Sequence, residues 1–206
     1  MQPKLIYLTR RHPGLDRAAF TPRWRQHGAL GMSRPRWTNI AQYVHCDVLD
    51  DSGYDGIGLI WHRSPGHRAA HLADTSSRLD MERDEAATFA RPIVEDCLIA
   101  QETVLVPPGV AADEARKVCA FFAAAPARPL ESRLPPLHAL GAPVLGCVRN
   151  DALPPERASG WGLAFPVVEE FWFGDEAAAR RAATYLRAQG AARAVLTNHV
   201  CLYRSP

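Results

Sequence analysis

Two stretches of the chain share one pattern, and this pattern decides the fold. Residues 169–189 read EEFWFGDEAAARRAATYLRAQ, an aromatic strand that passes through a short turn directly into an alanine-rich helix. Residues 57–61 read IGLIW and are followed by a polar turn and a helical stretch that contains Arg68. Aligning Trp61 with Trp172 superposes the two patterns and indicates an internal repeat.

Other segments extend the repeat in the same order along the chain. Residues 4–6, 43–49 and 102–105 lie over residues 117–119, 147–153 and 199–202. Each half then predicts the order strand, helix, strand, strand, helix, strand. In the first half we expect strands near 4–10, 40–49, 55–62 and 98–106, and helices near 16–31 and 66–90. In the second half we expect strands near 116–124, 143–151, 163–173 and 194–203, and helices near 130–140 and 175–189. Pro135-Pro136 argues against the helix at 130–140, because proline removes backbone donors.

This element order is the ferredoxin-like β-α-β-β-α-β unit, whose helices cover one face of an antiparallel sheet. Two such units in one chain can close their open faces against each other. We therefore expect an α+β protein with two tandem ferredoxin-like halves, residues 1–108 and 114–206, that form an intramolecular barrel of the dimeric α+β type. Pro107-Pro108-Gly109 is the natural linker between the halves.

Three segments of the first half are similar to the EthD family. Residues 15–32 (LDRAAFTPRWRQHGALGM) resemble its first helix, residues 54–61 (YDGIGLIW) its third strand, and Asp84-Glu85 with Phe89 its acidic segment. The resemblance covers residues 4–107, whereas the second half shares only the topology and Phe171-Trp172-Phe173.

The resemblance implies a dimeric α+β barrel with a pocket between the sheet and its helices. Its relatives include cofactor-free monooxygenases, cyclases, lactone isomerases and dehydratases, and more distantly haem enzymes. The sequence departs from the family at Gly28-Ala29, where a small residue and proline are common. The second half has lost most of the motif, and if only one half keeps a site, each chain has one active pocket rather than two.

Composition excludes several other classes of protein. The 24 basic and 22 acidic residues give a net charge of +2 without long charged runs, so neither nucleic acid nor an anionic membrane is an expected partner. The five cysteines are isolated, which argues against a disulfide framework and a zinc site. The N-terminus lacks a signal-peptide pattern, and no apolar run approaches the ~20 residues that span a bilayer. These features predict a cytoplasmic protein, and a homodimer is left open.

The first helix supplies the strongest candidate for chemistry. Phe20, Trp24 and His27 share one helix face at i, i+4 and i+7, and that face is expected to pack on the sheet. Imidazole titrates near neutrality, so His27 is the predicted general acid or base, and Trp24 is a predicted apolar wall of the substrate pocket. A core histidine bonded to the backbone is the alternative.

The second strand carries three polar residues on one face. Tyr43, His45 and Asp47 alternate along it, whereas Val44 and its alternating neighbours point the other way. We expect the polar face to line the barrel interior, with His45 and Tyr43 orienting the substrate or relaying protons and Asp47 binding it. A solvated strand face is the alternative.

Four further residues complete the predicted site. Trp61 is assigned to substrate binding, although core packing is its simpler role. Glu102 and His199 occupy equivalent places on the last strands of the two halves and are expected near the pseudo-twofold interface. Arg10 is expected at the barrel mouth, where it can hold a carboxylate or phenolate. His67 and His71 have a metal-compatible spacing but no third ligand, so no metal site is predicted.

These features favour a cofactor-independent enzyme that acts on a small aromatic or polyketide-like molecule. The expected step is a lyase or isomerase reaction, such as decarboxylation, dehydration, aldehyde elimination or double-bond movement. The alternatives are a cofactor-free or haem-dependent monooxygenase, and a non-catalytic accessory or binding protein of an oxidative degradation pathway. We expect no tightly bound haem, flavin or zinc.

Overall fold

The computed structural model describes residues 2–109, 115–154 and 162–205 of the chain. The first half comprises β1 (Pro3–Thr9), α1 (Arg17–Met32), β2 (Ile40–Asp47), β3 (Gly56–His62), α2 (Pro65–Ala73), α3 (Thr75–Thr88) and β4 (Cys97–Val106). The second half comprises β5 (Arg116–Phe122), α4 (Leu134–Ala139), β6 (Gly146–Ala152), β7 (Val167–Phe173), α5 (Glu176–Ala188), β8 (Arg193–Thr197) and β9 (Val200–Arg204). Short 3₁₀ turns, η1 (Pro35–Asn39), η2 (Ile93–Asp96) and η4 (Leu130–Arg133), join some of these elements.

Three predicted elements differ from the observed ones for local reasons. The long helix predicted at 66–90 is divided at Asp74, whose side chain accepts a hydrogen bond from the Ser77 amide and starts α3 as a new helix. The last strand is divided into β8 and β9. A helix does form between 130 and 140, because its prolines lie in the first turn of α4, where backbone donors have no helical partner.

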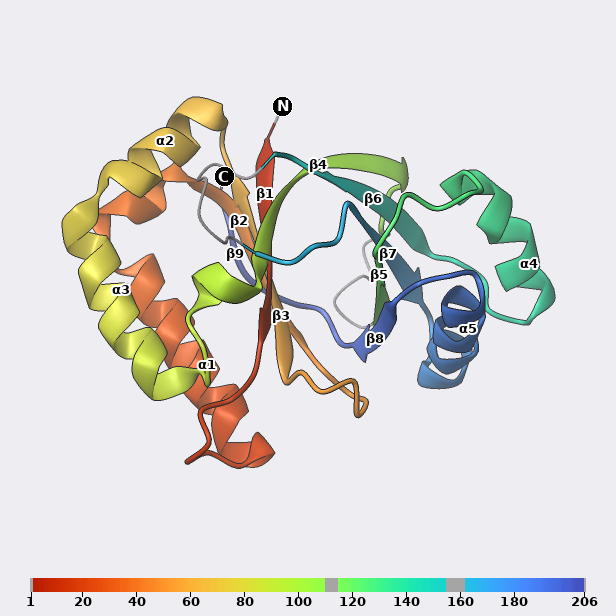
Figure 1. Cartoon of the computed structure of the whole chain (residues 1–206), viewed down its shortest axis with the longest axis horizontal. Coiled ribbons are helices and arrows are strands. Elements are labelled where there is room, and N and C mark those ends of the chain that lie inside the picture. The colour runs from red at the N-terminus through yellow and green to blue at the C-terminus, as the bar shows by residue number, and fades with distance from the viewer. Residues whose placement is uncertain (1, 110–114, 155–161, 206) are drawn as a thin grey trace.

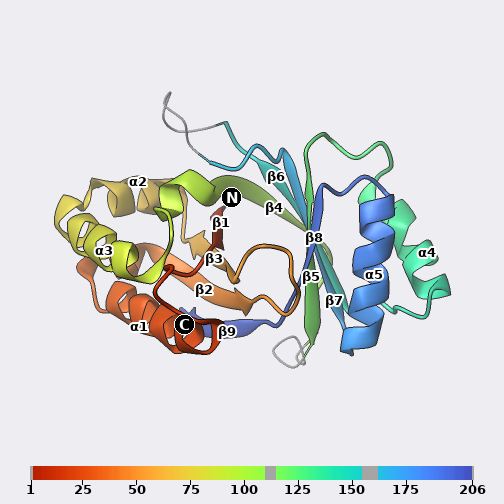
Figure 2. The ribbon, with the colours of Figure 1, turned by 60° about the horizontal axis from the view of Figure 1, so that its bottom comes forward.

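The strands form one nine-stranded sheet that closes on itself. The strand order is β8-β5-β7-β6-β4-β1-β3-β2-β9, with all neighbours antiparallel. The two outermost strands, β8 and β9, follow each other in the chain, so a single segment runs from β5 to β2 and completes the barrel. On the opposite side β4 pairs with β1 along one stretch and with β6 along another. Figures 1 and 2 show the resulting arrangement, with α1, α2 and α3 outside one half and α4 and α5 outside the other.

The strand register confirms the tandem ferredoxin-like repeat at the level of single residues. Lys4 pairs with Trp61 in the first half, and Lys117 pairs with Trp172 in the second. The same alignment places Tyr43 over Cys147, because each lies one residue beyond the partner of the aligned tryptophan. Two tandem ferredoxin-like halves in one α+β barrel are therefore confirmed, whereas the boundaries 1–108 and 114–206 stay predictions.

The barrel interior is largely apolar, and this corrects the predicted orientation of β2. Val44, Cys46 and Val48 point into the barrel and pack with Cys119 and Phe121 of the second half. The alternating residues Tyr43 and His45 therefore point outward, beneath α1. The prediction that the polar face of β2 lines the barrel interior is wrong, because the closed barrel is filled by apolar side chains from both halves.

One polar cluster lies inside the barrel. Lys4 and Lys117 are fully buried, and each ammonium lies over a tryptophan ring, 4.3 Å from the Trp61 centroid and 4.5 Å from the Trp172 centroid. Glu170 accepts hydrogen bonds from both lysines. Burial acts to raise the pKa of Glu170, but the two ammonium groups outweigh it and hold this pKa well below its usual range. The cluster thus joins β1 of one half to β5 and β7 of the other.

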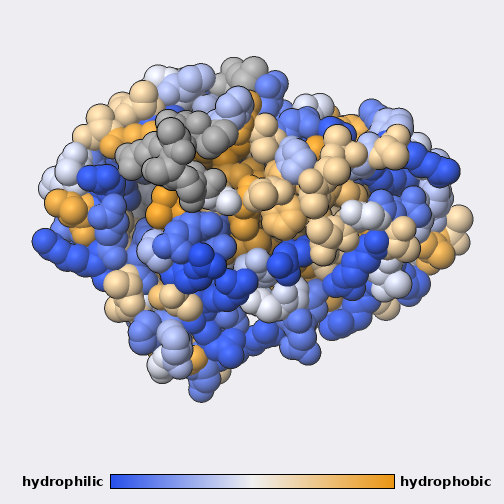
Figure 3. Space-filling model, viewed as in Figure 1, coloured by the Kyte–Doolittle hydropathy of each residue, from blue (hydrophilic) through white to orange (hydrophobic). Residues whose placement is uncertain are grey.

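Apolar side chains are also concentrated where the two halves meet at the surface. The hydropathy view in Figure 3 shows an orange area between the halves, partly hollowed. A shallow pocket of 410 Å³ lies at the junction, lined by Leu98 of β4 together with Leu163 and Phe165 just before β7. Among the described residues, no helix has both the length and the apolar character required to cross a bilayer.

Candidate functional site

A cavity with two adjoining chambers lies in the first half, between the outer face of the sheet and α1 and α3. The outer chamber has a volume of 850 Å³ and the inner one 110 Å³. Leu5 of β1, Ile60 of β3 and Arg36 of η1 line both chambers, as do His71 of α2 and Glu85 of α3. The combined space lies within the range of small-molecule sites.

His27 lines the inner chamber and is held by a carboxylate from another helix. The Nδ1 atom of His27 lies 2.7 Å from Oδ2 of Asp84, and the imidazole is 3% exposed. Asp84 also accepts a 2.6 Å hydrogen bond from Nη2 of Arg23, one turn before His27 on α1. Burial tends to raise the pKa of Asp84, but the hydrogen bonds from Arg23 and His27 outweigh it and lower this pKa. Asp84 is therefore a carboxylate at neutral pH.

This arrangement fixes the protonation state of His27. Burial lowers the pKa of His27 below its usual value, although Asp84 opposes the shift, so the ring is neutral at pH 7. A carboxylate can only accept, so the single ring proton lies on Nδ1 and is donated to Asp84. The Nε2 atom is then unprotonated and can act as a base.

Tyr43 and Tyr7 line the same inner chamber and end a chain of buried hydrogen bonds. The Tyr7 and Tyr43 hydroxyl oxygens are 2.8 Å apart, and the Tyr43 oxygen lies 2.5 Å from Nε2 of His45. The Nδ1 atom of His45 lies 2.6 Å from Nη1 of Arg25, whose Nη2 atom donates to both carboxylate oxygens of Asp47 at 2.6 and 2.7 Å.

From Arg25 through His45 to Tyr43, the hydrogen bonds can have only one direction. A guanidinium can only donate, so Nδ1 of His45 accepts from Arg25 and the imidazole proton lies on Nε2. His45 therefore donates to the Tyr43 oxygen, which leaves the proton of Tyr43 free to point to Tyr7 or into the chamber. Burial raises the pKa values of both tyrosines, so both hydroxyls stay protonated. One hydroxyl proton is used in the hydrogen bond between the two tyrosines, so the other is left for the chamber that His27 also lines.

His45 is a positioning residue and lines neither chamber. It is fully buried, and its ring stacks on Trp24 with centroids 3.7 Å apart. Burial and the neighbouring guanidinium of Arg25 lower its pKa well below the usual value, so it stays neutral. A Cβ atom at Gly28 would lie 3.2 Å from the Tyr43 ring and 3.3 Å from His45, so the glycine allows α1 to pack closely on these two side chains. Trp24 therefore holds the His45 ring in place by stacking on it.

Three residues of the site were not assigned to it from the sequence: Tyr7 and Glu85, which line the cavity, and Asp84, which holds His27. Tyr7 alternates with Leu5 on β1, and a Cβ at its partner Gly58 would lie 1.9 Å from the tyrosine ring, so this glycine makes the space for Tyr7. Asp84 and Glu85 belong to the acidic segment of the family resemblance. The sequence resemblance therefore marked both residues, but it did not show that Asp84 contacts His27.

His62 and His71 form a second, neutral histidine pair in the outer chamber. Their ring centroids are 5.2 Å apart, and Nδ1 of His71 donates to the Arg36 carbonyl oxygen at 3.3 Å. Burial, assisted by nearby arginines, lowers the pKa of His62 to about 3 and that of His71 to about 4. Both rings are uncharged at neutral pH.

Replacing His62 by Phe is expected to make the fold less sensitive to acid. Phenylalanine stands at the equivalent position of the second half, Phe173, so the substitution suits the fold. The unfolded chain binds a proton below about pH 6.5 that the folded chain excludes until its pKa of about 3. His62 therefore lowers stability as the pH falls from about 6.5, by about 1.4 kcal/mol per pH unit. Urea unfolding of wild type and His62→Phe between about pH 7 and pH 5 measures this difference, and equal slopes would contradict it.

The structure places the other predicted site residues away from the cavity. Trp61 and Glu102 lie in the barrel, where the Trp61 indole donates to Glu102 at 3.1 Å and Lys4 contacts both. His199 is also buried, with its ring 5.9 Å from that of Trp172. Asp47 is half-buried and holds Arg25 and Asn198. Trp61, Glu102 and His199 therefore belong to the interior of the barrel, and Asp47 belongs to the hydrogen-bonded chain through Arg25. None of the four lines either chamber.

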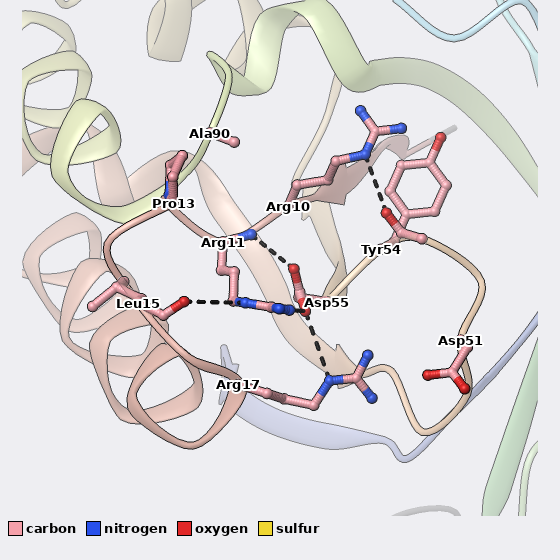
Figure 4. Close-up of a pocket in the computed structure, with 10 residues that line it drawn as sticks. Arg10, Arg11, Pro13, Leu15, Arg17, Asp51, Tyr54, Asp55 and Ala90 are labelled. Carbon is pink, nitrogen blue, oxygen red and sulfur yellow. Dashed lines mark hydrogen bonds and ion pairs between the residues drawn. The ribbon is translucent and has the colours of Figure 1, made fainter.

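Arg10 lies at a separate surface pocket of 490 Å³, which Figure 4 shows in close-up. Its guanidinium covers the Tyr54 ring at 4.6 Å, and its Nε atom donates to the Gly53 carbonyl. Arg11 and Arg17 both turn toward Asp55 in the same view. Arg10 therefore stabilises the loop between β2 and β3, and it is not brought together with His27.

The second half has lost the polar groups of this site. The register places Ala120 at the position of Tyr7 and Cys147 at that of Tyr43. The position of Gly58 is taken by Glu169, which pairs with buried Arg133 at 2.6 Å. The outer face of this half is packed with apolar side chains, including Phe171 and Phe173. Of the two described halves, only the first therefore carries the histidine and tyrosine constellation.

Comparisons with known proteins support the fold. No protein-family model matches the chain, and no curated protein matches it significantly. An anthrone oxidase-like protein shares the structure with a TM-score of 0.57, at 10% identity over 98% of this chain and 92% of that one. A proposed monooxygenase from Fusobacterium nucleatum gives 0.53 at 7% identity over 100% and 98%. A chlorite dismutase from Candidatus Nitrospira defluvii, in complex with imidazole, gives 0.50 at 10% identity over 100% and 91%. At these identities the likeness shows the dimeric α+β barrel fold alone.

Haem enzymes are among the distant relatives that the sequence resemblance implies, so His27 is a conceivable iron ligand. A haem bound there would need room for a flat macrocycle beside the imidazole. The inner chamber has 110 Å³, the space of about four water molecules, so a haem does not fit at His27. Among the described residues, no group of three or more histidine, cysteine or acidic side chains has a metal-binding arrangement.

Proposed function

We propose that the first-half cavity is the active site of a cofactor-independent enzyme of the EthD type, which acts on a small aromatic or polyketide-like molecule. The proposed reaction is a lyase or isomerase step that begins with removal of a proton next to a carbonyl group. His27 is the general base, and Tyr43 with Tyr7 binds the carbonyl oxygen.

The observation that carries this proposal is that an unprotonated histidine and two protonated tyrosines line the same small buried chamber. His27 presents a lone pair because Asp84 holds its proton on the other ring nitrogen. Tyr43 presents a hydroxyl donor because His45 already donates to its oxygen. A base and an acid in one chamber are the groups that enolisation requires.

The chemical step follows from these positions. As His27 takes the α-proton of the substrate, negative charge develops on the carbonyl oxygen. The hydrogen bond from the tyrosine whose proton is free then strengthens, while the other tyrosine donates to that hydroxyl, and in a buried chamber such preorganised donors stabilise the transition state more than water does. The protonated His27 is stabilised by Asp84 and can return the proton at another atom, which completes an isomerisation, or to a leaving group, which completes an elimination.

A cofactor-free monooxygenase is the second candidate, because the same deprotonation gives a carbanion that can react with dioxygen. The observation in its favour is again the His27 base in one chamber with the tyrosine hydroxyls. Oxygen consumption with an activated phenolic ketone separates the two: an oxygenase consumes oxygen in proportion to product, whereas a lyase or isomerase does not. A non-catalytic binding protein would show neither turnover nor proton exchange.

The proposed function is tested by hydrogen–deuterium exchange of a small ketone. 4-Acetylbenzoate and its neutral analogue 4-acetylbenzamide are incubated with the protein in D₂O, and loss of the methyl proton signal is followed by NMR. We expect the protein to accelerate exchange of at least one probe above the buffer rate. Exchange at the buffer rate for both probes, although they bind, would contradict a general base in the cavity.

A further inference from the structure

Arg36 stands where the two chambers of the cavity meet. It belongs to the 3₁₀ turn η1, is half-buried and lines both chambers. Its backbone oxygen is fixed by His71. Within the described parts of the chain, no carboxylate oxygen lies within the 4.0 Å ion-pair distance of its guanidinium. A half-buried guanidinium without a direct carboxylate partner is unusual, because its desolvation is then not offset by a salt bridge.

The other charged groups around the cavity have partners of their own. Arg78 pairs with Glu82 at 3.7 Å, and Arg91 pairs with Glu95 at 2.8 Å. Asp74 acts on Arg36 only at longer range, because its carboxylate accepts hydrogen bonds from Ser77 at the start of α3.

Glu85 is the carboxyl group that shares both chambers with Arg36. It accepts a 3.3 Å hydrogen bond from the Ile93 amide, and burial raises its pKa to about 7. Near neutral pH it is therefore only partly ionised, and the neighbouring His62 and His71 are neutral. The junction between the chambers thus carries a positive charge at Arg36 that Asp74, Glu82 and Glu85 offset only at longer range, without a direct ion pair.

We infer that Arg36 binds a carboxylate group carried by the substrate and so selects anionic over neutral aromatic ketones. This inference rests on the proposed function of the same cavity. Guanidinium binds carboxylate with two parallel hydrogen bonds, which fixes orientation as well as position. With the carboxylate at Arg36, the body of the substrate occupies the outer chamber, and only its carbonyl end enters the 110 Å³ inner chamber beside Tyr43 and His27.

Calorimetric titration with 4-acetylbenzoate and 4-acetylbenzamide tests this inference, because the two probes differ mainly in charge. Wild type is expected to bind the carboxylate probe about tenfold more tightly than the amide, as befits one charge-assisted hydrogen-bonding pair. Arg36→Gln is expected to remove this preference while amide binding changes less than about twofold. Arg36→Lys, which keeps the charge without the planar fork, is expected to restore part of it.

Arg91→Gln is the matched control, because it removes the same charge from the rim of the outer chamber. It is expected to leave the preference within about twofold of wild type. Equal binding of the two probes by wild type, binding of neither at the limit of solubility, or equal losses in Arg36→Gln and Arg91→Gln would each overturn the inference. His27→Gln should keep the preference, so a failed base and a failed carboxylate site give different results.

Discussion

His27→Gln is expected to lower the rate of α-proton exchange by about 10²–10⁴-fold at neutral pH, the range that general acid–base catalysis contributes. Glutamine has no lone pair of comparable basicity, but its amide group can still donate to Asp84. Folding is therefore expected to change by about 1 kcal/mol or less. The measurement is NMR exchange of 4-acetylbenzoate and 4-acetylbenzamide, together with urea unfolding of the same samples.

The rate of proton exchange is also expected to depend on pH in one direction. Because burial lowers the pKa of His27, the ring stays unprotonated below pH 6.5, and exchange falls only when the pH drops through that lowered pKa. Asp84→Asn keeps the imidazole but removes the carboxylate that fixes its tautomer, so it should also slow exchange. His138→Gln, in α4 of the second half, should not. Near-normal exchange in His27→Gln with a loss of several kcal/mol in stability would identify His27 as a core histidine instead.

Glu170→Gln is expected to destabilise the protein by about 3–5 kcal/mol, the usual cost of removing one partner from a buried ion pair. The substitution keeps the shape of the side chain but leaves Lys117 buried without a countercharge. Lys4 retains Glu102, which lies 2.6 Å from its ammonium nitrogen. Urea or guanidinium unfolding of wild type and variant at neutral pH measures the change.

The double variant Glu170→Gln with Lys117→Met is the matched control for this cluster. Removing both charges leaves no unpaired ion, so most of the lost stability is expected to return. Leu59 occupies the place of Glu170 in the first half, which shows that the fold accepts an uncharged residue there. A cost below about 1 kcal/mol in the single variant, or no recovery in the double variant, would mean that the lysines are not held as buried cations.

The sequence predicted the fold well because the decisive signals are local. Each strand and helix of the repeat has its own periodicity, and the alignment of Lys4 with Lys117 and of Trp61 with Trp172 agrees with the observed register, in which each lysine pairs with the tryptophan of its own half. Helix periodicity also placed His27 correctly on the sheet-facing side of α1, although a chemical role for it stays a proposal. The closure through β8 and β9 was not predicted in detail, since the sequence indicated a single strand over 194–203, whereas β8 pairs with β5 and β9 with β2.

The site was predicted less well because its contacts join residues that are distant in the chain. Alternation on β2 separates Tyr43 and His45 from Val44, but it does not say which face meets the helices. That choice depends on the apolar residues of β5, such as Phe121, which fill the barrel from the other half. Likewise, no pattern within α1 or α3 shows that Asp84 contacts His27. Glu102 and His199 were assigned to the site only because they occupy equivalent positions in the two halves.

The most direct test of the central claim is a crystal structure of the full chain with 4-acetylbenzoate bound. The account predicts ligand density in the first-half cavity, with the acetyl oxygen within hydrogen-bond distance of Tyr43 or Tyr7 and the methyl carbon facing His27. Density confined to the barrel interior or to the surface pocket at Arg10, with the first-half cavity empty at a saturating ligand concentration, would contradict it.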